Sequence, residues 1–339
     1  MASLSTDVLV VNAGSTSIKL SVVDGDDESV AVASLEEAPP VAFVGHRVVH
    51  GGERFGAPTA IDDDVVTALE SVVELAPLHN APALEGIREA RALLPDATHV
   101  AVFDTAFHRT IPAVARTYAL PRRFRELGIR RYGFHGLSVA WAAERVAVAR
   151  LVVCHLGGGG SVTAVKDGQS IDTTMGFTPL EGVPMATRAG SLDPGALLYL
   201  LHHGVSLDEL DDALEHESGL VGLAGSGDVA VLEAETSDEA KLALDIYCYR
   251  IAQAVAAMAT ALGGLDALVF TAGVGEHSAW VRSAICRRLE HLGVTIDDEA
   301  NAGLAGDGAL ETAGAPVKVH VVRAREDVVV ARGVRALLG

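Results

Sequence analysis

The stretches VLVVNAGSTSIKLSVVDG (8–25) and LVVCHLGGGGSVTAVKDG (151–168) are two copies of one pattern. Each copy is an apolar strand, a turn of small residues, a second strand and an Asp-Gly turn, which is typical of a β-hairpin. A second likeness pairs residues 99–106 with residues 266–273, where an apolar strand breaks into a small-residue loop. Two likenesses in the same chain order indicate a duplicated α/β domain.

Helical patterns alternate with these strands, which predicts α/β layers. The clearest pattern has Ser278 as its cap and Gly293 as its end. The expected helices are 67–76, 81–94, 138–149, 242–262 and 278–292. No Pro- or Ser-rich linker separates the two halves, so we expect two packed domains with a cleft between them.

Length and charge exclude several classes of protein. The chain has 339 residues, and at about 150 residues per domain this suggests two domains. Its 26 Lys and Arg against 45 Asp and Glu give a net charge of −19, which argues against nucleic acid as a partner. The apolar run 251–265 is shorter than the roughly 20 residues of a membrane span, and it predicts a buried helix. We therefore expect a cytoplasmic protein that needs no membrane.

Three small-residue loops follow apolar strands, at 12–19, 155–161 and 271–276. Glycine allows backbone N–H groups to approach phosphate oxygens, and hydroxyls with a lysine add donors and charge. None of the loops has the spacing of a Walker A or dinucleotide-binding motif. A tight hairpin would explain any one of them alone, whereas three in a duplicated chain favour a clamped nucleotide. The duplicated hairpin resembles the phosphate clamp of the actin, Hsp70 and sugar-kinase superfamily.

Nine motifs along the chain together resemble the acetate kinase family. They are NAGSTSIK (12–19), HRVVHGG (46–52), APLHN (76–80), FDTAFH (103–108), YGFHG (132–136), HLGGGGS (155–161), TTMGFTPLEGVPMATRAGSLDP (173–194), FTAGVGE (270–276) and RED (325–327). The resemblance implies reversible transfer of the ATP γ-phosphoryl group to acetate, with Mg²⁺ or Mn²⁺ as the cofactor. It also implies duplicated actin-like (ribonuclease H-like) domains, at 1–106 plus 327–339 and at 107–326, and a homodimer.

The resemblance also implies a set of site residues. Asp104, His135 and Arg188 match catalytic positions, and Asn12 and Glu326 match metal positions. The acetate pocket corresponds to Arg47, Val49, Leu78, Phe134 and Pro179. The nucleotide site corresponds to Lys19, His155, Leu156, Gly157, Gly158, Gly159, Asp228, Val229, Ala230, Gly273, Val274, Gly275, Glu276 and His277. His79 and His108 are as well explained by turns or caps as by contact with a ligand.

The chemistry suits these residue types. A carboxylate is already ionised at pH 7, so it needs no strong base, but it must approach a polyanionic triphosphate. At 4 Å and an effective dielectric near 20, each pair of like charges costs about 4 kcal/mol, so cations must dominate the site. Arg47 is expected to hold the substrate carboxylate, and Arg188 and His135 to stabilise the transferring group. For Asp104, orienting Arg188 or a metal-bound water fits better than accepting a proton.

Several departures from the family pattern concern the nucleotide. Gly158 and His277 replace asparagines, and Ala230 replaces an arginine that flanks the adenine. Other changes are Val139, Ala186, Ala189 and Ser191. The segment between Lys19 and Arg47 is also shorter than usual, as if a helix were missing from the first domain.

Three other functions remain open on the sequence. The first is the same chemistry on propionate or butyrate, because one methylene is worth only about 1–3 kcal/mol of discrimination. The second is a pyrophosphate-linked or other phosphoryl donor, which the changed adenine side would suit. The third is a non-catalytic nucleotide-binding switch, which would have no reason to keep Arg47, Asp104, His135 and Arg188 together.

Overall fold

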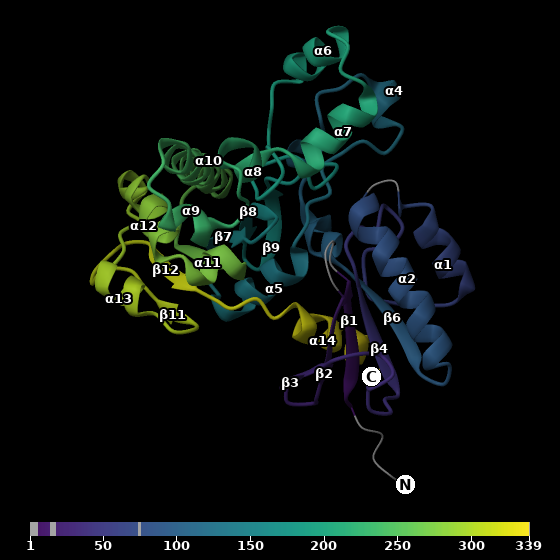
Figure 1. The fold of residues 1–339 in the computed structure, drawn as a ribbon. Coiled ribbons are helices and arrows are strands. Elements are labelled where there is room, and N and C mark those ends of the chain that lie inside the picture. The colour runs from purple at the N-terminus through teal and green to yellow at the C-terminus, as the bar shows by residue number, and fades with distance from the viewer. Residues whose placement is uncertain (1–5, 14–17, 74–75, 339) are drawn as a thin grey trace. The chain divides into compact units, whose positions relative to one another are not determined.

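The computed structural model describes residues 6–13, 18–73 and 76–338. These residues form two compact units (Figure 1). The first unit comprises residues up to 109, together with 134–141 and the chain from 325 onward, and the second comprises 110–133 and 142–324. The sequence placed 134–141 in the second domain, but this segment, which carries His135, belongs to the first unit.

The first unit is built on a six-stranded sheet of order β3-β2-β1-β4-β6-β5. Its strands are β1 (Val8–Ala13), β2 (Ile18–Val23), β3 (Ser29–Val32), β4 (Phe43–Val48), β5 (Thr59–Ala60) and β6 (Thr98–Phe103). Its helices are α1 (Asp63–Glu70), α2 (Pro77–Leu93) and α14 (Glu326–Leu338). The first residues of α5 (Gly136–Arg145) also belong to this unit. A 3₁₀ segment, Asp104–Thr110, leads out of β6.

The second unit has a sheet of order β11-β12-β10-β7-β8-β9. Its strands are β7 (Arg150–Leu156), β8 (Gly160–Lys166), β9 (Gln169–Thr173), β10 (Ala267–Thr271), β11 (Gly308–Ala309) and β12 (Lys318–Val321). Its longer helices are α6 (Pro194–His202), α7 (Leu207–His216), α10 (Asp238–Leu262) and α12 (Ala279–Arg287). The shorter ones are α3 (Ala113–Arg116), α4 (Arg122–Arg125), α8 (Gly219–Ala224), α9 (Val229–Ala234), α11 (Ala272–His277) and α13 (Asp298–Gly303).

The two sheets share one topology. A central strand pairs with an antiparallel hairpin partner on one side and with a parallel strand on the other: β1 lies between β2 and β4, and β7 lies between β8 and β10. The duplicated hairpin predicted from residues 8–25 and 151–168 is therefore confirmed. The second likeness, between residues 99–106 and 266–273, is wrong as a prediction of equivalent strands. It paired residues of β6 with residues of β10, but β10 occupies the place of β4, and β12 that of β6.

Each expected helix overlaps an observed one, but four begin earlier than expected, and α1 and α5 also end earlier, at Glu70 and Arg145. Side-chain caps explain two of these starts, because Asp62 accepts a hydrogen bond from Val65 N–H and Ser237 accepts one from Ala240 N–H. The fifth begins as predicted, with Ser278 accepting from Val281 N–H. It is interrupted after Arg287 and continues as the 3₁₀ turn Glu290–Leu292 before Gly293.

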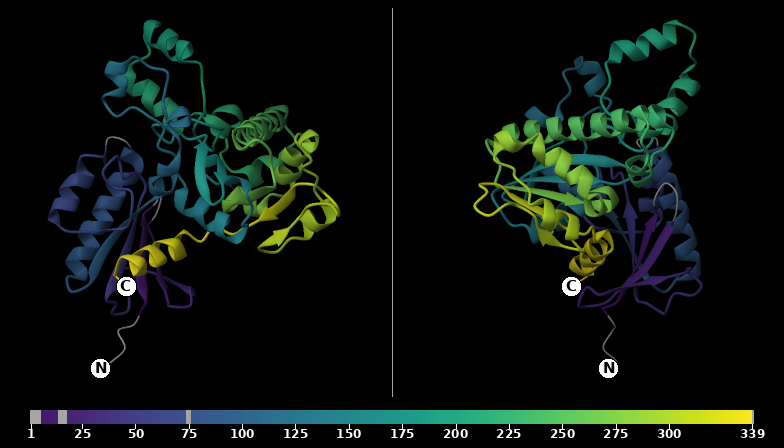
Figure 2. Two further views of the ribbon diagram at one scale, coloured as in Figure 1. Left: turned by 180° about the vertical axis from the view of Figure 1, so that it is seen from behind. Right: turned by 60° about the vertical axis from the view of Figure 1, so that its left-hand side comes forward.

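Helix α10 packs against the sheet of the second unit (Figure 2). Tyr247, Ile251 and Val255 on this helix are at most 1% exposed and belong to the unit's apolar core. By length and composition α10 could cross a membrane, but half of its apolar window is buried, and a core helix of a soluble protein passes the same test. The expectation of a buried helix is confirmed as far as Leu262, where Gly263 ends the helix with a left-handed backbone.

The short segment before Arg47 is joined to the C-terminal helix. Residues 20–46, all of which are described, contain no helix. In the tight turn before β3, the Asp27 carboxylate accepts hydrogen bonds from Arg332 Nε (2.8 Å) and Arg335 Nη1 (3.0 Å) of α14. Burial raises the pKa of Asp27, but these two arginines outweigh it and hold that pKa below its usual value. Because α14 begins at Glu326, this contact helps to fix the position of a predicted site residue.

Candidate active site

Four predicted site residues of the first unit converge at one edge of its sheet. Asn12 and Arg47 are register partners on the parallel strands β1 and β4. Asp104 follows the next parallel strand, β6, and Glu326 is the first residue of α14. The carboxyl ends of neighbouring parallel strands meet at the same edge, which is where α/β sheets bind ligands.

Arg47 lies at the centre of this group. Its Nε and Nη2 donate to the two carboxylate oxygens of Asp104, at 3.1 and 2.6 Å. Its Nη1 donates to Asn12 Oδ1 at 3.1 Å and lies 2.9 Å from Glu326 Oε2. Among the described residues these contacts use four of the five guanidinium hydrogens, leaving one on Nη2. Asp104 is therefore paired with Arg47 inside its own unit, an arrangement that sequence reasoning did not foresee.

The electrostatics of this pair follow from burial. The Asp104 side chain is fully buried, and burial raises the pKa of its carboxyl above the usual value. Arg47 opposes this most strongly, through its charge and its hydrogen bonds. Burial lowers the pKa of Arg47, but Asp104 and Glu326 outweigh it and raise that pKa, so the arginine stays charged. Arg47 thus favours the ionised form of the Asp104 carboxyl.

Asn12 and Glu326 carry oxygen atoms of the kind that divalent cations take as ligands. Asn12 Oδ1 and Glu326 Oε2 both lie against the cationic Nη1 of Arg47, and Asn12 Nδ2 also donates to Glu326 Oε2 at 3.3 Å. Amide and carboxylate oxygens are the ligands that Mg²⁺ takes in proteins, usually with several waters. Within the described ranges no group of three or more His, Cys, Asp or Glu could hold a metal, so the protein would supply only part of the coordination.

His135 is held beside Asp104 by an unusual backbone. Its φ is 59°, in the left-handed region that non-glycine residues rarely adopt. A hydrogen bond from the His135 backbone to Asp104 lowers the pKa of that carboxyl. A Cβ on the next residue, Gly136, would lie 1.9 Å from the Asp104 carbonyl oxygen, so only glycine fits there. Such local strain is typical of functional sites.

The residues predicted for the acetate pocket come from both units. Val49 and Phe134 are buried in the first unit, at 4% and 1% exposure. His108 is also buried, and its Nε2 lies 2.9 Å from the Phe134 carbonyl oxygen, so it helps to hold the backbone at Phe134 in place. Leu78 and His79 lie in α2, but their side chains fall outside the described residues. Pro179 belongs to the second unit.

Arg188 is a buried cation of the second unit, at 9% exposure. Its Nη1 donates to the Pro179 carbonyl oxygen at 3.2 Å, and its Nε lies 3.9 Å from a carboxylate oxygen of Glu215. Burial lowers the pKa of Arg188, and Glu215 only partly opposes this. A buried guanidinium with so distant a counter-charge gains much from an anion.

A pocket of about 410 Å³ in the second unit collects most of the predicted nucleotide residues. Eight of them line it: Gly157, Gly158, Asp228, Val229, Ala230, Gly273, Val274 and His277. Six do not: Lys19, His155, Leu156, Gly159, Gly275 and Glu276. Leu156 belongs to the apolar core, and Glu276 caps a backbone N–H at Ala324. Lys19 is exposed in the first unit, and residues 14–17 of its loop lie outside the described residues.

Sequence reasoning missed three residues that line this pocket: Gly227, Glu233 and Ser278. The Ser278 hydroxyl donates to a carboxylate oxygen of Glu233. Glu233 lies one helical turn after Ala230 on α9, so the helical period could have identified it. The lining includes two carboxylates and no Lys or Arg, which suits the neutral base and the ribose better than the phosphates.

The fold and these groups of residues are those of a phosphotransferase on duplicated actin-like domains. A sequence model of the acetokinase family matches residues 30–332 of this chain. An acetate kinase from Synechococcus sp. (strain JA-2-3B'a(2-13)) is 47% identical over 316 residues, which cover 90% of this chain and 78% of that protein. The chain belongs to the acetokinase family.

Further relatives agree with this membership. An acetate kinase from Clavibacter michiganensis subsp. michiganensis is 42% identical over 386 aligned positions, covering 96% of this chain and 97% of that protein. Because this alignment is longer than the 339-residue chain, it contains gaps where the relative has residues that this chain lacks. A propionate kinase from Francisella tularensis has a TM-score of 0.90 at 33% identity, covering 97% of this chain and 99% of its own. The acetate kinase of Porphyromonas gingivalis has a TM-score of 0.86 at 32% identity, covering 98% of this chain and 100% of its own.

Proposed function

We propose that this chain is an acetate kinase that transfers the γ-phosphoryl group of ATP reversibly to acetate, giving acetyl phosphate and ADP. The observation that carries the proposal is the buried contact of Arg47 with Asp104, Asn12 and Glu326. A non-catalytic nucleotide switch would gain nothing from maintaining so costly a charge cluster. Family membership and the glycine-lined pocket of the second unit support the same reaction.

The acetate carboxylate is the nucleophile and needs no general base. One carboxylate oxygen forms the new O–P bond as the bond to the ADP leaving oxygen breaks, so no proton has to move. Arg47 offers its remaining Nη2 hydrogen to the carboxylate, and Val49 and Phe134 enclose the methyl group. Arg188 and His135 stabilise charge on the phosphoryl oxygens, which is the main way that proteins accelerate phosphoryl transfer.

Asn12 and Glu326 would hold Mg²⁺, with water completing the coordination. When bound, the ion would neutralise charge on the triphosphate. Asp104 keeps the Arg47 guanidinium in one orientation through two hydrogen bonds, at 3.1 and 2.6 Å. We therefore propose that Asp104 orients Arg47, whereas the sequence led us to expect that it orients Arg188 or a metal-bound water.

Trapping the acyl phosphate with hydroxylamine tests the acceptor. Acetate, propionate and butyrate should be compared by kcat/KM with ATP and Mg²⁺. We propose acetate as the preferred acid, and propionate is the second candidate because a propionate kinase has the same fold at a TM-score of 0.90. A higher kcat/KM for propionate than for acetate would assign the chain to that substrate.

Donor selectivity should be weak. The Ala230 side chain cannot stack on a purine as an arginine would, so the base gains little specific recognition. We expect ATP and GTP to differ by about tenfold or less in kcat/KM, which corresponds to about 1.4 kcal/mol. Competing donors in the acyl-phosphate assay measure this ratio. A preference for ATP above about a hundredfold would contradict it, and activity with pyrophosphate alone would replace ATP as the donor.

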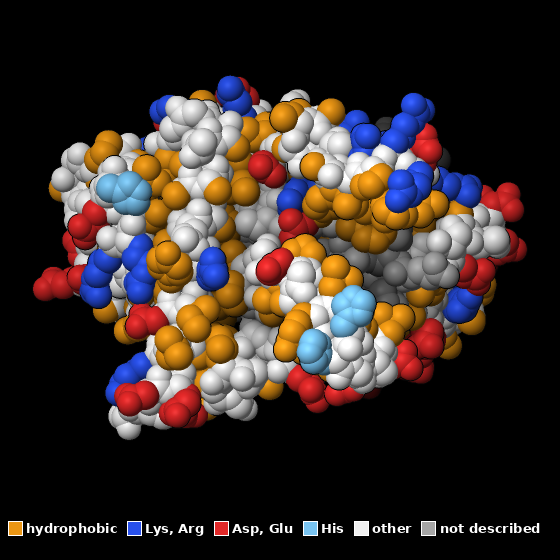
Figure 3. Space-filling view, turned by 90° about the horizontal axis from the view of Figure 1, so that it is seen from above, with side chains coloured by type: hydrophobic (Ala, Val, Ile, Leu, Met, Phe, Trp, Pro, Cys, Tyr) orange, Lys and Arg blue, Asp and Glu red, His pale blue; other side chains and the backbone are white. Residues whose placement is uncertain are grey.

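We further propose a cytoplasmic homodimer assembled through the second unit. Helix α6 has no buried residue in its described range, and Leu198 and Tyr199 on it are 58% and 61% exposed. Hydrophobic side chains are exposed over much of the face seen in Figure 3, and large exposed apolar patches mark contact surfaces. Light scattering at micromolar concentration should give twice the chain mass. A monomer, or recovery of the chain with membranes, would contradict the proposal.

A further inference from the structure

The segment between β9 and α6 is long and irregular, and it carries predicted site residues. Residues 174–193 contain neither helix nor strand, yet they carry Pro179 and Arg188. Loops of this length without secondary structure are uncommon in compact domains. Because Arg188 must be placed accurately to stabilise a transferring phosphoryl group, something has to hold this loop.

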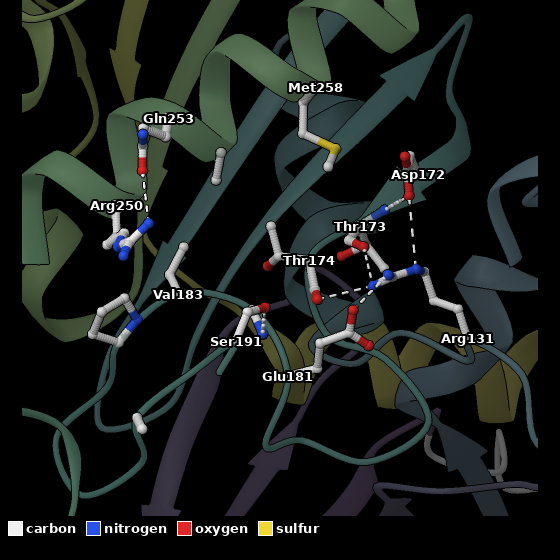
Figure 4. Close-up of a pocket in the computed structure, with 14 residues that line it drawn as sticks. Arg131, Asp172, Thr173, Thr174, Glu181, Val183, Ser191, Arg250, Gln253 and Met258 are labelled. Atoms are coloured by element: carbon white, nitrogen blue, oxygen red, sulfur yellow. Dashed lines mark hydrogen bonds and ion pairs between the residues drawn. The ribbon is translucent and has the colours of Figure 1, made fainter. Parts of the chain in front are cut away.

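Arg131 fastens the beginning of the loop. The two hydrogens of its Nη1 are shared among three consecutive carbonyl oxygens, those of Thr173 (2.7 Å), Thr174 (2.9 Å) and Met175 (3.1 Å). Its Nη2 donates to Glu181 Oε1 at 2.8 Å, as Figure 4 shows. One guanidinium thus joins residues 173–175 to residue 181.

Tyr118 fastens the middle of the loop. Its hydroxyl donates to Glu181 Oε2 and accepts a hydrogen bond from Phe177 N–H at 3.0 Å. Burial, together with the hydrogen bond to Glu181, raises the pKa of Tyr118, so this hydroxyl remains a donor at neutral pH. A Cβ on Gly176 would lie 1.7 Å from the Glu181 carboxylate and 2.1 Å from the Tyr118 hydroxyl, so the loop closes tightly over the pair.

Pro179 lies midway between the two fastened residues, Phe177 and Glu181. Its carbonyl oxygen accepts the 3.2 Å hydrogen bond from Arg188 Nη1. We propose that Arg131, Glu181 and Tyr118 are positioning residues that fix the Pro179 carbonyl and thereby orient Arg188. The proposal rests on the role given to Arg188 under the proposed function. None of the three residues needs to touch the substrate.

The cavity in Figure 4 makes this clamp testable by substitution. It has a volume of about 300 Å³, and its walls include Arg131, Glu181 and the α10 residues Gln253 and Met258. Glu181 therefore borders open space, and shortening its side chain creates no sealed void. Arg250 on the α10 wall donates to Gln253 at 3.2 Å and has no part in the clamp, so Arg250→Gln is the matched control.

Glu181→Ala should lower kcat by about 10- to 100-fold, as expected for a small displacement of a catalytic group, while the KM for ATP changes less than about threefold. Glu181→Gln should recover part of the loss, and Tyr118→Phe should give a smaller decrease in kcat. In an Arg188→Ala background the Glu181→Ala change should have almost no further effect on kcat, because the clamp acts through Arg188. Arg250→Gln should behave as wild type.

Hydrogen exchange of the intact chain supplies a readout that does not depend on activity. Amides of residues 173–182 should exchange faster in Glu181→Ala and Tyr118→Phe than in wild type, and those of α10 should not. Unchanged exchange in this segment, or equal loss of kcat from Glu181→Ala with and without Arg188, would overturn the clamp. A wild-type chain that makes no acyl phosphate would instead overturn the proposed function, and the exchange result would still decide whether the clamp exists.

Discussion

Arg188→Ala is expected to lower kcat for acetyl phosphate formation by about 10²- to 10³-fold, which corresponds to about 2.7–4 kcal/mol of transition-state stabilisation. The KM for acetate should change far less, because the role proposed for Arg188 is to stabilise charge that develops during transfer. The reason lies in its surroundings: it is buried, bonded through Nη1 to one carbonyl oxygen, and 3.9 Å from Glu215. His135→Ala should likewise lower kcat strongly and change the KM for acetate far less.

Steady-state kinetics with saturating ATP and Mg²⁺ measure this effect. Arg123→Ala is a suitable control, since Arg123 lies on the short helix α4, where its guanidinium stacks over Phe124. Arg188→Lys tests whether charge alone is sufficient, because lysine cannot reproduce the planar fork of a guanidinium. Near-normal turnover in Arg188→Ala would remove this residue from the catalytic site.

Arg47→Ala is expected to destabilise the protein by about 3–5 kcal/mol, besides weakening acetate binding. The substitution leaves the fully buried Asp104 carboxylate without its cation, and Glu326 remains nearby as a like charge. The pKa of Asp104, already raised by burial, should rise further. A group whose pKa is raised on folding loses its contribution to stability as pH increases through that pKa. The variant should therefore fall further below wild type at pH 8 than at pH 5.

Urea unfolding at these two pH values measures the free energy of unfolding. The double variant Arg47→Ala/Asp104→Asn is the internal control, because a neutral amide needs no counter-charge. It should recover a large part of the stability that Arg47→Ala loses, and it should lose the pH dependence while remaining inactive. An equal loss of stability in the single and double variants would contradict the ion-pair account.

Part of this picture could be predicted from the sequence. The hairpin repeat at 8–25 and 151–168 defined both halves of the fold, because strands and tight turns leave a local pattern. The second repeat failed because apolar strands followed by small residues are common, so β6 resembled β10 without being equivalent to it. Helix starts shifted where caps such as Asp62 and Ser237 lay before the apolar pattern.

The site was partly accessible in the same way. Motif matching identified Arg47, Asp104 and Glu326 singly, but it gave no sign that they contact one another. Such contacts join residues far apart in sequence, and only the parallel strand order brings them together. The Arg131–Glu181–Tyr118 clamp was missed for a similar reason. A hydrogen bond from a guanidinium to backbone carbonyls leaves no signature in the residues that provide those carbonyls.

In the proposed reaction, an acetate oxygen attacks the γ-phosphorus of ATP. Phosphorus-31 NMR of the intact chain with ATP, Mg²⁺ and ¹⁸O-labelled acetate tests it most directly. We expect an acetyl phosphate resonance that is displaced by the isotope, because the labelled carboxylate oxygen becomes the C–O–P bridge. Formation of ADP and inorganic phosphate without acetyl phosphate, or an acetyl phosphate with no label in the bridge, would contradict it.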